Sequence, residues 1–301
     1  MTAIPIIVAT NHKGGVGKTN SVRVLGQALA SNPKLSKGKP VLIVDMDPQC
    51  NSSSRWELVK PSDDGNLVPI PHPDPSMEGE SSSVCDVWLN LLDPAASAYQ
   101  PAPYETSHPN LHVVPGNEEL MYKVMKLPEE QQSLMPKLLR RWLRSPEIAK
   151  KYSFVLIDTP PAKGELTTAA LGAATHAYVP FIPEPLSVNG LFSILTYLSA
   201  QQAERDFGDN LVLLGFLPNM VQPTTLLHKE ALHVLKRNET FSKLLMDVQL
   251  RRRIGYSETD NTLARPGDVT SAAGSNIAAE AKRFARIVGE KAMATLNGVS
   301  V

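Results

Sequence analysis

The chain has 301 residues, enough for one large α/β domain or two small ones with a substantial buried core. Its 30 Lys and Arg balance 30 Asp and Glu, which argues against a highly basic nucleic-acid coat protein but leaves local patches possible. The two cysteines, Cys50 and Cys85, are far apart and lack a C-x-x-C spacing, so we expect neither a zinc nor an iron–sulfur site. The apolar N-terminus is too short for a signal peptide, and no apolar run reaches the ~18–20 residues of a membrane span, so we expect a cytoplasmic protein.

Short apolar runs recur along the chain and predict the strands of a parallel sheet. None alternates with polar residues, which is typical of strands that are buried on both faces. The runs are residues 4–9, 41–45, 154–158 and 211–216, with 177–182 as a fifth candidate. Helical patterns lie between them, at residues 18–31, 137–151, 165–174, 188–205 and 224–237. Alternating strands and helices predict an α/β fold with a doubly wound, mostly parallel sheet.

Residues 60–115 interrupt this alternation. They contain ten prolines, which break helices and remove hydrogen-bond donors, so we expect mostly irregular chain. Within the segment, residues 83–92 favour a helix and 111–114 a strand. We interpret the rest as a surface excursion of one domain that spans residues 1–301, with a C-terminal helical region at about 276–297.

The stretch "NHKGGVGKTN" at residues 11–20 resembles a phosphate-binding loop between a strand and a helix. Gly17, Lys18 and Thr19 match the end of the G-x-x-x-x-G-K-[ST] pattern, whereas His12 replaces its first glycine. Lys18 is expected at the β- and γ-phosphates, and the Thr19 hydroxyl at Mg²⁺. Glycines let backbone N–H groups approach phosphate oxygens, and the start of the helix adds positive potential. The residues expected to bind nucleotide are Gly14, Gly15, Val16, Gly17, Lys18, Thr19 and Asn20.

Acidic residues end two other predicted strands, at the sheet edge where ligands bind in doubly wound folds. Asp158 fits the acid that holds the Mg²⁺ shell of a phosphate-loop enzyme, usually through water. Asp45 and Asp47 flank the other strand end. An acid there can orient the attacking water or the metal shell. A purely structural role for one of the two is the alternative.

A second lysine, Lys13, stands at the front of the loop, which needs only Lys18. A cation at that position could reach the phosphates of a neighbouring subunit, as an arginine finger supplied in trans does. The alternative is a solvated lysine.

Several segments resemble the ParA/MinD family of P-loop ATPases. "KGGVGKT" is similar to the deviant Walker A motif of that family, in which the front lysine is the signature. "VLIVDMDPQCNSS" resembles its switch segment, "FVLIDTPPAKGELTTAAL" its Walker B strand and the following switch, and "PFIPEPLSVNGL" and "LHVVPGNEEL" two further strand ends. The resemblance covers about residues 4–235, and the variant loop does not need a glycine at position 12.

This resemblance implies ATP and Mg²⁺ as cofactors and a homodimer that forms on ATP binding. Lys13 would bridge to the nucleotide of the partner subunit, and Lys18 would bind the phosphates of its own. Asp47 would position the hydrolytic water, with Asp45 in the metal shell and Asp158 holding Mg²⁺ through water. Asn219 matches a position that often contacts adenine in the family, although a turn asparagine explains it equally well.

Among the members of the family, the DNA-partitioning ATPases resemble the chain best. The iron–sulfur carriers need cysteines in their second half, and both cysteines here precede residue 86. The stretch 229–291 has twelve Lys and Arg against eight Asp and Glu, including the run Arg251, Arg252 and Arg253. The cations that could join this run in space are Lys236, Arg237, Lys243, Lys282, Arg283 and Arg286. The sequence therefore predicts nonspecific, salt-sensitive DNA binding through C-terminal arginines and lysines. The resemblance implies a cargo-bound ParB-like activator and association with the nucleoid. A solvated basic face is the alternative.

Two other functions stay open at this point. A MinD-like regulator would bind membrane through its last helix, but the stripe at residues 277–296 is rich in alanine and favours a helix docked on the body, so we expect no stable membrane association. A phosphoryl-transfer enzyme with a small substrate would use the long 60–115 excursion for specificity.

Overall fold

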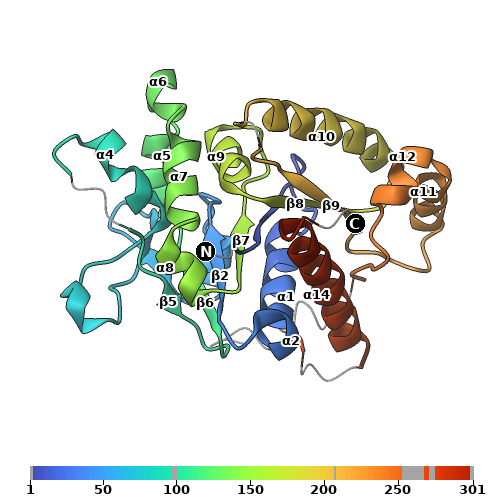
Figure 1. The fold of residues 1–301 in the computed structure, drawn as a ribbon, viewed down its shortest axis with the longest axis horizontal. Coiled ribbons are helices and arrows are strands. Elements are labelled where there is room, and N and C mark those ends of the chain that lie inside the picture. Colours follow the sequence, from blue (N-terminus) through green and yellow to red (C-terminus); the bar gives the residue numbers. More distant parts are fainter. Residues whose placement is uncertain (1–2, 97–99, 207, 253–267, 271–274, 299–301) are drawn as a thin grey trace.

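A seven-stranded sheet forms the centre of the computed structural model, which describes residues 3–96, 100–206, 208–252, 268–270 and 275–298 (Figure 1). Its strand order is β5-β6-β2-β7-β1-β8-β9, and every neighbouring pair is parallel except β5 with β6. In chain order the strands are β1 (Ile6–Ala9), β2 (Val41–Asp45), β5 (Tyr104–Glu105), β6 (Leu111–Val114), β7 (Phe154–Asp158), β8 (His176–Phe181) and β9 (Val212–Pro218). The predicted doubly wound, mostly parallel sheet is confirmed.

Helices cover both faces of the sheet. They are α1 (Lys18–Ala30), α2 (Pro33–Ser36), α3 (Asn51–Ser54), α4 (Leu89–Leu92), α5 (Glu118–Val124), α6 (Glu129–Gln132), α7 (Met135–Leu143), α8 (Pro146–Lys151), α9 (Glu165–Ala173), α10 (Pro185–Ala203), α11 (Leu226–Arg237), α12 (Glu239–Leu244) and α14 (Ser275–Leu296). Two apolar cores result, because side chains alternate between the faces of a strand. On β1, Ile6 and Val8 join the core under α7, α9 and α10, while Ile7 and Ala9 join the core under α1 and α14.

The helix predicted at residues 137–151 is two helices, so this prediction was wrong in part. Pro146 has no N–H for an intrahelical hydrogen bond, which ends α7 and makes Pro146 the first residue of α8. The Ser145 hydroxyl caps α8 by accepting a hydrogen bond from the Ile148 N–H. The helix predicted at 83–92 is likewise divided, into the 3₁₀-helix η2 (Val84–Trp88) and α4.

Residues 60–115 hold more structure than their prolines indicate. A hairpin pairs β3 (Val59–Pro61) with β4 (Leu67–Pro69), and the short 3₁₀-helix η1 spans Pro75–Met77. Tyr104 on β5 fastens the segment, since its hydroxyl accepts a hydrogen bond from the Ser82 N–H and donates one to the Ile70 carbonyl, 3.0 and 2.8 Å long. Proline-rich chain is thus fixed to the sheet edge by hydrogen bonds from a neighbouring strand.

The last helix, α14, lies against α1 on one face of the sheet (Figure 1). The stripe of Ile277, Ala281, Phe284, Val288 and Ala292 is buried, as expected for a helix docked on the body. Within the described ranges, no helix is long and apolar enough to cross a membrane.

Candidate nucleotide site

The loop between β1 and α1 has the backbone shape of a phosphate cradle. Gly15 and Gly17 adopt left-handed φ angles of 73° and 78°, which favour glycine. A Cβ built on Gly17 would lie only 2.5 Å from Nδ2 of Asn219, so position 17 has no room for a side chain. The left-handed backbone conformation and the contact with Asn219 therefore both require glycine at position 17.

Asn219, at the end of β9, holds this loop in place. Its side-chain amide donates to the carbonyls of Val16 and Gly17, at 2.8 and 3.2 Å, and its Oδ1 accepts from the Met220 N–H. Both ends of the amide are thus occupied by backbone groups. The adenine contact inferred for Asn219 stays a prediction, and the geometry adds a supporting role beneath the loop.

Lys18 begins α1 and is almost completely buried. Its Nζ donates to the carbonyl of Asn11 at 3.0 Å and to that of Lys13 at 3.4 Å, so the ammonium folds back along its own loop. Burial lowers the pKa of Lys18, while the negative charges of Asp158 and Asp47 act in the opposite direction. The charge that would meet a nucleotide phosphate is therefore fixed between the loop and these acids.

Asp158 has the features of a residue that holds a cation. It ends β7 without solvent exposure, and its Oδ2 accepts a 2.8 Å hydrogen bond from the Ser52 hydroxyl. Its buried Oδ1 has no hydrogen-bond partner among the residues that the structure describes. Burial raises the pKa of Asp158, although the hydroxyls of Ser52 and Thr19 favour its charged form. A bound cation would supply that missing partner and keep the carboxylate charged. Asp158 and Thr19 thus fit a Mg²⁺ that takes its other ligands from phosphates and water.

Asp45 lies beside Asp158, because β2 and β7 pair in the register that joins these two residues. Burial, and then the neighbouring Asp158, raise the pKa of Asp45. Its Oδ2 accepts from both the N–H and the hydroxyl of Ser53, at 2.8 and 2.6 Å, and its Oδ1 accepts from the Asp47 N–H. Asp45 therefore stabilises the turn that carries Asp47. The predicted place of Asp45 in the metal shell stays a prediction.

Asp47 lies in the wall of the pocket that also contains Lys18 and Thr19. Its Oδ1 accepts a 3.0 Å hydrogen bond from the Gln49 N–H, and burial raises its pKa. A carboxyl with a raised pKa is a better proton acceptor at neutral pH, which suits a residue that orients water.

The pocket itself measures about 500 Å³, within the size range of small-molecule sites. The P-loop contributes Gly15, Gly17, Lys18, Thr19 and Asn20 to its wall. Gln49, Asn51 and Pro161 also line the pocket, and they lie in the quoted segments although no role was assigned to them. Arg55 and Met220 complete the wall, and the sequence patterns did not single them out because only the fold brings them to the loop.

Arg251 and Arg252 line this same pocket. Arg251 also lines a neighbouring hollow, together with Lys236 and Arg283. Arg251 forms a parallel bridge with Val221, and both its N–H and its Nε lie near the Glu280 carboxylate, at 3.2 and 3.6 Å. The third arginine of the run, Arg253, lies outside the described residues. DNA binding by these arginines stays a prediction, and two of them lie in the wall of the nucleotide site.

Lys13 and His12, in front of the loop, face α10. Lys13 is exposed, and its Cε and Nζ lie 3.5 and 3.8 Å from the position of a Cβ on Gly190. The His12 ring packs edge-on against Tyr197 with a centroid distance of 4.7 Å, and burial lowers the pKa of His12 to about 4. The residue that replaces the first P-loop glycine is thus a packing residue at neutral pH.

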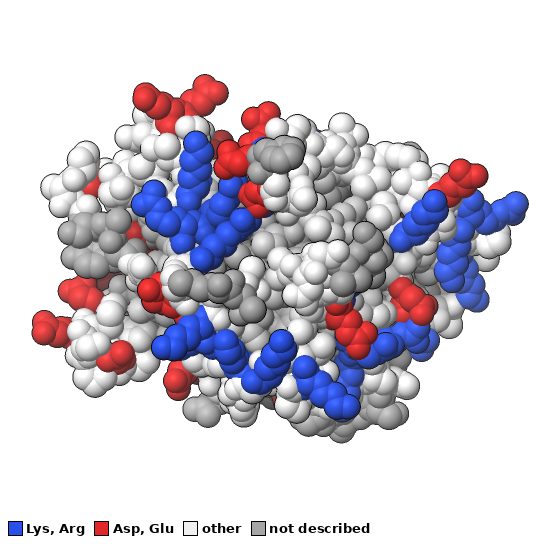
Figure 2. Space-filling model, viewed as in Figure 1, with Lys and Arg blue, Asp and Glu red and all other residues white. Residues whose placement is uncertain are grey.

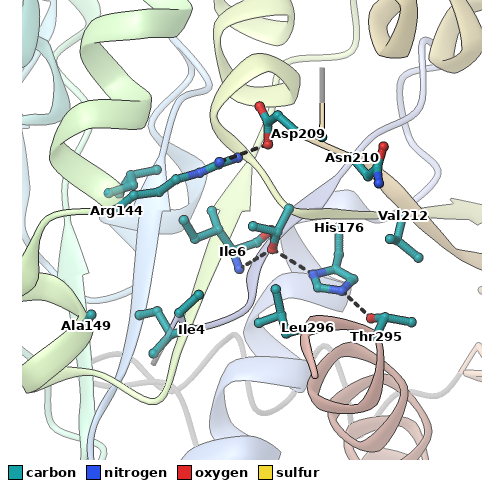
Figure 3. Close-up of a pocket in the computed structure, with 14 residues that line it drawn as sticks. Ile4, Ile6, Arg144, Ala149, His176, Asp209, Asn210, Val212, Thr295 and Leu296 are labelled. Carbon is teal, nitrogen blue, oxygen red and sulfur yellow. Dashed lines mark hydrogen bonds and ion pairs between the residues drawn. The ribbon is translucent and has the colours of Figure 1, made fainter. Parts of the chain in front are cut away.

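A second cavity, of about 330 Å³, opens near the amino ends of β1, β8 and β9 (Figure 3). His176 lies in its wall and is hydrogen-bonded to the hydroxyls of Thr175 and Thr295, both at 2.7 Å. The P-loop follows the carboxyl end of β1, so this cavity lies at the opposite edge of the sheet and takes no part in the nucleotide site.

The doubly wound sheet, the two-lysine loop and the acids that end β2 and β7 define a P-loop nucleoside triphosphatase. A sequence model described as an AAA domain matches residues 4–211. The chain belongs to the ParA/Soj family of ATPases within this class.

Three relatives illustrate the similarity. The chromosome-partitioning ATPase Soj of Treponema pallidum is 28% identical over 253 residues, which are 84% of this chain and 85% of that protein. A putative plasmid partition protein from Borrelia burgdorferi, solved bound to AMPPNP, shares the fold with a TM-score of 0.68 at 17% identity, covering 96% of this chain and 99% of that one. Cobyrinic acid a,c-diamide synthase from Mycobacterium smegmatis, solved with an ATP analogue and magnesium, is 26% identical with a TM-score of 0.61 over 86% of this chain and 94% of that chain.

Proposed function

We propose that this ATPase positions a plasmid, a chromosome region or another large cargo, using ATP to close a homodimer that holds nonspecific DNA. The observation that carries the proposal is Lys13, an exposed cation at the front of a phosphate loop that already contains a buried Lys18. Lys13 is not among the described residues that line the pocket of its own subunit, which supports a role toward the nucleotide of a second one. The partition relatives at 28% identity or lower support the cargo role.

Within each subunit, the chain's own groups have distinct tasks. The amides of Gly15 and Gly17 and the Lys18 ammonium bind phosphate, and Asp47 orients a water molecule toward it. Thr19 and Asp158 would hold a Mg²⁺ ion, which would neutralise negative charge on the phosphates. A cargo-bound ParB-like protein stimulates hydrolysis, which lowers the affinity for DNA and resets the cycle; such coupling requires that ATP bind the dimer better than the monomer.

Lys13→Ala tests the dimer. We expect the dimer dissociation constant with ATP and Mg²⁺ to rise at least about 30-fold, because a charge pair at an interface is lost. Analytical ultracentrifugation measures this constant, and Lys60→Ala, an exposed lysine on β3, serves as the matched control. An unchanged dimer in Lys13→Ala would remove the trans-lysine argument.

A second candidate function is phosphoryl transfer to a small substrate. The observation in its favour is the 26% identity to the diamide synthase, whose fold the chain shares. ATP turnover by the purified protein, with and without duplex DNA, separates the two candidates. Turnover or ATP-dependent assembly that responds to DNA supports partitioning, whereas indifference to DNA favours the small-substrate enzyme.

A further inference from the structure

A hollow of about 520 Å³ separates the end of α1 and the short helix α2 from α14. Four of its lining residues are cations, namely Lys34 from α2 and Lys282, Arg283 and Arg286 from α14. No acidic residue is among the described residues that line it. Cations from segments almost 250 residues apart in the sequence thus meet at one hollow.

The α2 side of the hollow extends this positive charge. Lys37 and Lys39 follow α2 and are exposed, and the sequence from 31 to 44 contains no Asp or Glu. Figure 2 shows a row of Lys and Arg side chains across the lower part of the molecule, in the region of α2 and α14, with acidic side chains above its right-hand part. We call Lys34, Lys37, Lys282, Arg283 and Arg286 the basic groove.

Two acids pair with members of the basic groove, but both pairs are exposed. Arg283 contacts Asp247, whose side chain is 93% exposed, and Arg286 lies 3.7 Å from Glu290, one helical turn along α14. Exposed pairs of this kind stabilise a protein by only about 0–1 kcal/mol. A phosphate group can therefore replace either acid at little cost.

The backbone N–H groups at the start of α2 are already hydrogen-bonded and are not available to a small phosphate ion. Asn32 Oδ1 accepts from the N–H groups of both Lys34 and Leu35, at 3.1 and 3.3 Å. Binding would therefore rely on long, solvated cationic side chains. Such groups suit an extended row of phosphates, and they do not read bases.

We propose that the basic groove, rather than the run at 251–253, holds the phosphate backbone of duplex DNA. This inference rests on the proposed function, and it deepens that function by locating the DNA. Two observations support the relocation. The arginines Arg251 and Arg252 line the nucleotide pocket, whereas the basic groove shares no described lining residue with that pocket.

An anionic membrane is the less suitable partner for the same charges. Membrane-binding helices insert a bulky apolar face, yet Ile277, Phe284 and Val288 of α14 are packed against the body of the protein. The face of α14 toward solvent carries Lys282, Arg283 and Arg286.

The test compares two triple variants of the full-length chain with the wild type. Lys34→Ala/Lys282→Ala/Arg286→Ala removes three charges from the basic groove. Lys137→Ala/Arg141→Ala/Lys150→Ala removes three exposed charges from α7 and α8 and is the matched control. Binding to a random-sequence DNA duplex is measured by fluorescence anisotropy with AMPPNP and Mg²⁺, across a salt series, and binding to anionic phosphatidylserine vesicles is measured in parallel.

We expect the groove variant to lose about 100-fold in DNA affinity near 0.1 M salt and to lower the slope of log K against log[salt] by about 2 to 3. The control variant should stay near the wild type, and all three proteins should bind AMPPNP equally. A groove variant with wild-type DNA affinity would overturn the inference and leave the proposed function intact. A wild-type protein that binds no DNA would overturn both the inference and the proposed function. A groove variant that loses vesicle binding but keeps DNA binding would assign the basic groove to membranes.

Discussion

Gly17 shows at the scale of a single residue how the nucleotide site constrains the sequence. Gly17→Ala places a methyl group 2.5 Å from Asn219 and forces a left-handed φ on alanine, so we expect it to lower the free energy of unfolding by about 2–4 kcal/mol. Gly14→Ala is the matched control, because its Cβ would meet nothing closer than 3.9 Å, and it should cost less than about 1 kcal/mol. Urea denaturation without nucleotide measures both, and equal losses would contradict the steric argument.

Asp47 is the second residue with a separable role. Asp47→Ala should retain ATP-dependent dimerisation but lower turnover by about 10²–10⁴-fold, the usual contribution of a group that orients or deprotonates the nucleophile. Single-turnover hydrolysis in the preformed dimer isolates this step from binding. Normal turnover would transfer the water-positioning role to another residue, and Asp45 would be the next to test.

At the scale of elements, His176 joins β8 to α14 through the hydroxyls of Thr175 and Thr295 (Figure 3). Burial lowers the pKa of His176 from 6.5 to about 4, so the folded state binds fewer protons than the unfolded state between these values. Stability from this group is therefore complete above pH 6.5 and is lost as the pH falls toward 4. Between pH 7 and pH 5 we expect a loss of about 2 kcal/mol from His176.

His176→Gln should remove this part of the pH dependence while leaving that of His12. Guanidinium unfolding curves at pH 7 and pH 5 measure the difference in both proteins. The same drop in unfolding free energy with and without His176 would show that its ionisation does not matter to folding.

Local patterns predicted the parallel strands of the main sheet and the shape of the phosphate loop, because each depends on neighbouring residues. The short strands β3, β4 and β5 were missed, because they lie in the proline-rich segment that was expected to be mostly irregular. Buried runs such as Phe154–Asp158 need both faces apolar, and the loop needs glycines at fixed spacing. The helix break at Pro146 also depends on neighbouring residues, but it was missed because the helical pattern continues on both sides of the proline. The places of Asn219 and Arg251 could not be predicted, because β9 and the segment after it reach the P-loop only through the sheet order.

At the scale of the whole molecule, a bound nucleotide should stabilise the fold, because its pocket combines segments that lie between residues 15 and 252 of the chain. With AMPPNP and Mg²⁺ at about 100 times the dissociation constant, stabilisation should reach about 2.7 kcal/mol, or a Tm increase of about 4 °C. Lys18→Ala should abolish most of the increase, whereas Lys60→Ala should retain it. Differential scanning fluorimetry measures the shift, and a full shift in Lys18→Ala would show that this lysine does not bind the phosphates.

The hydrogen bond from Asn219 to the Val16 carbonyl joins residues 203 positions apart. During synthesis at about 5–20 residues per second, the loop leaves the ribosome roughly 10–40 s before the residue that supports it. The growing chain therefore carries an unfinished P-loop for most of its translation. We therefore expect nucleotide binding to require that β9 has emerged and docked, and a product truncated before Asn219 should bind ATP weakly.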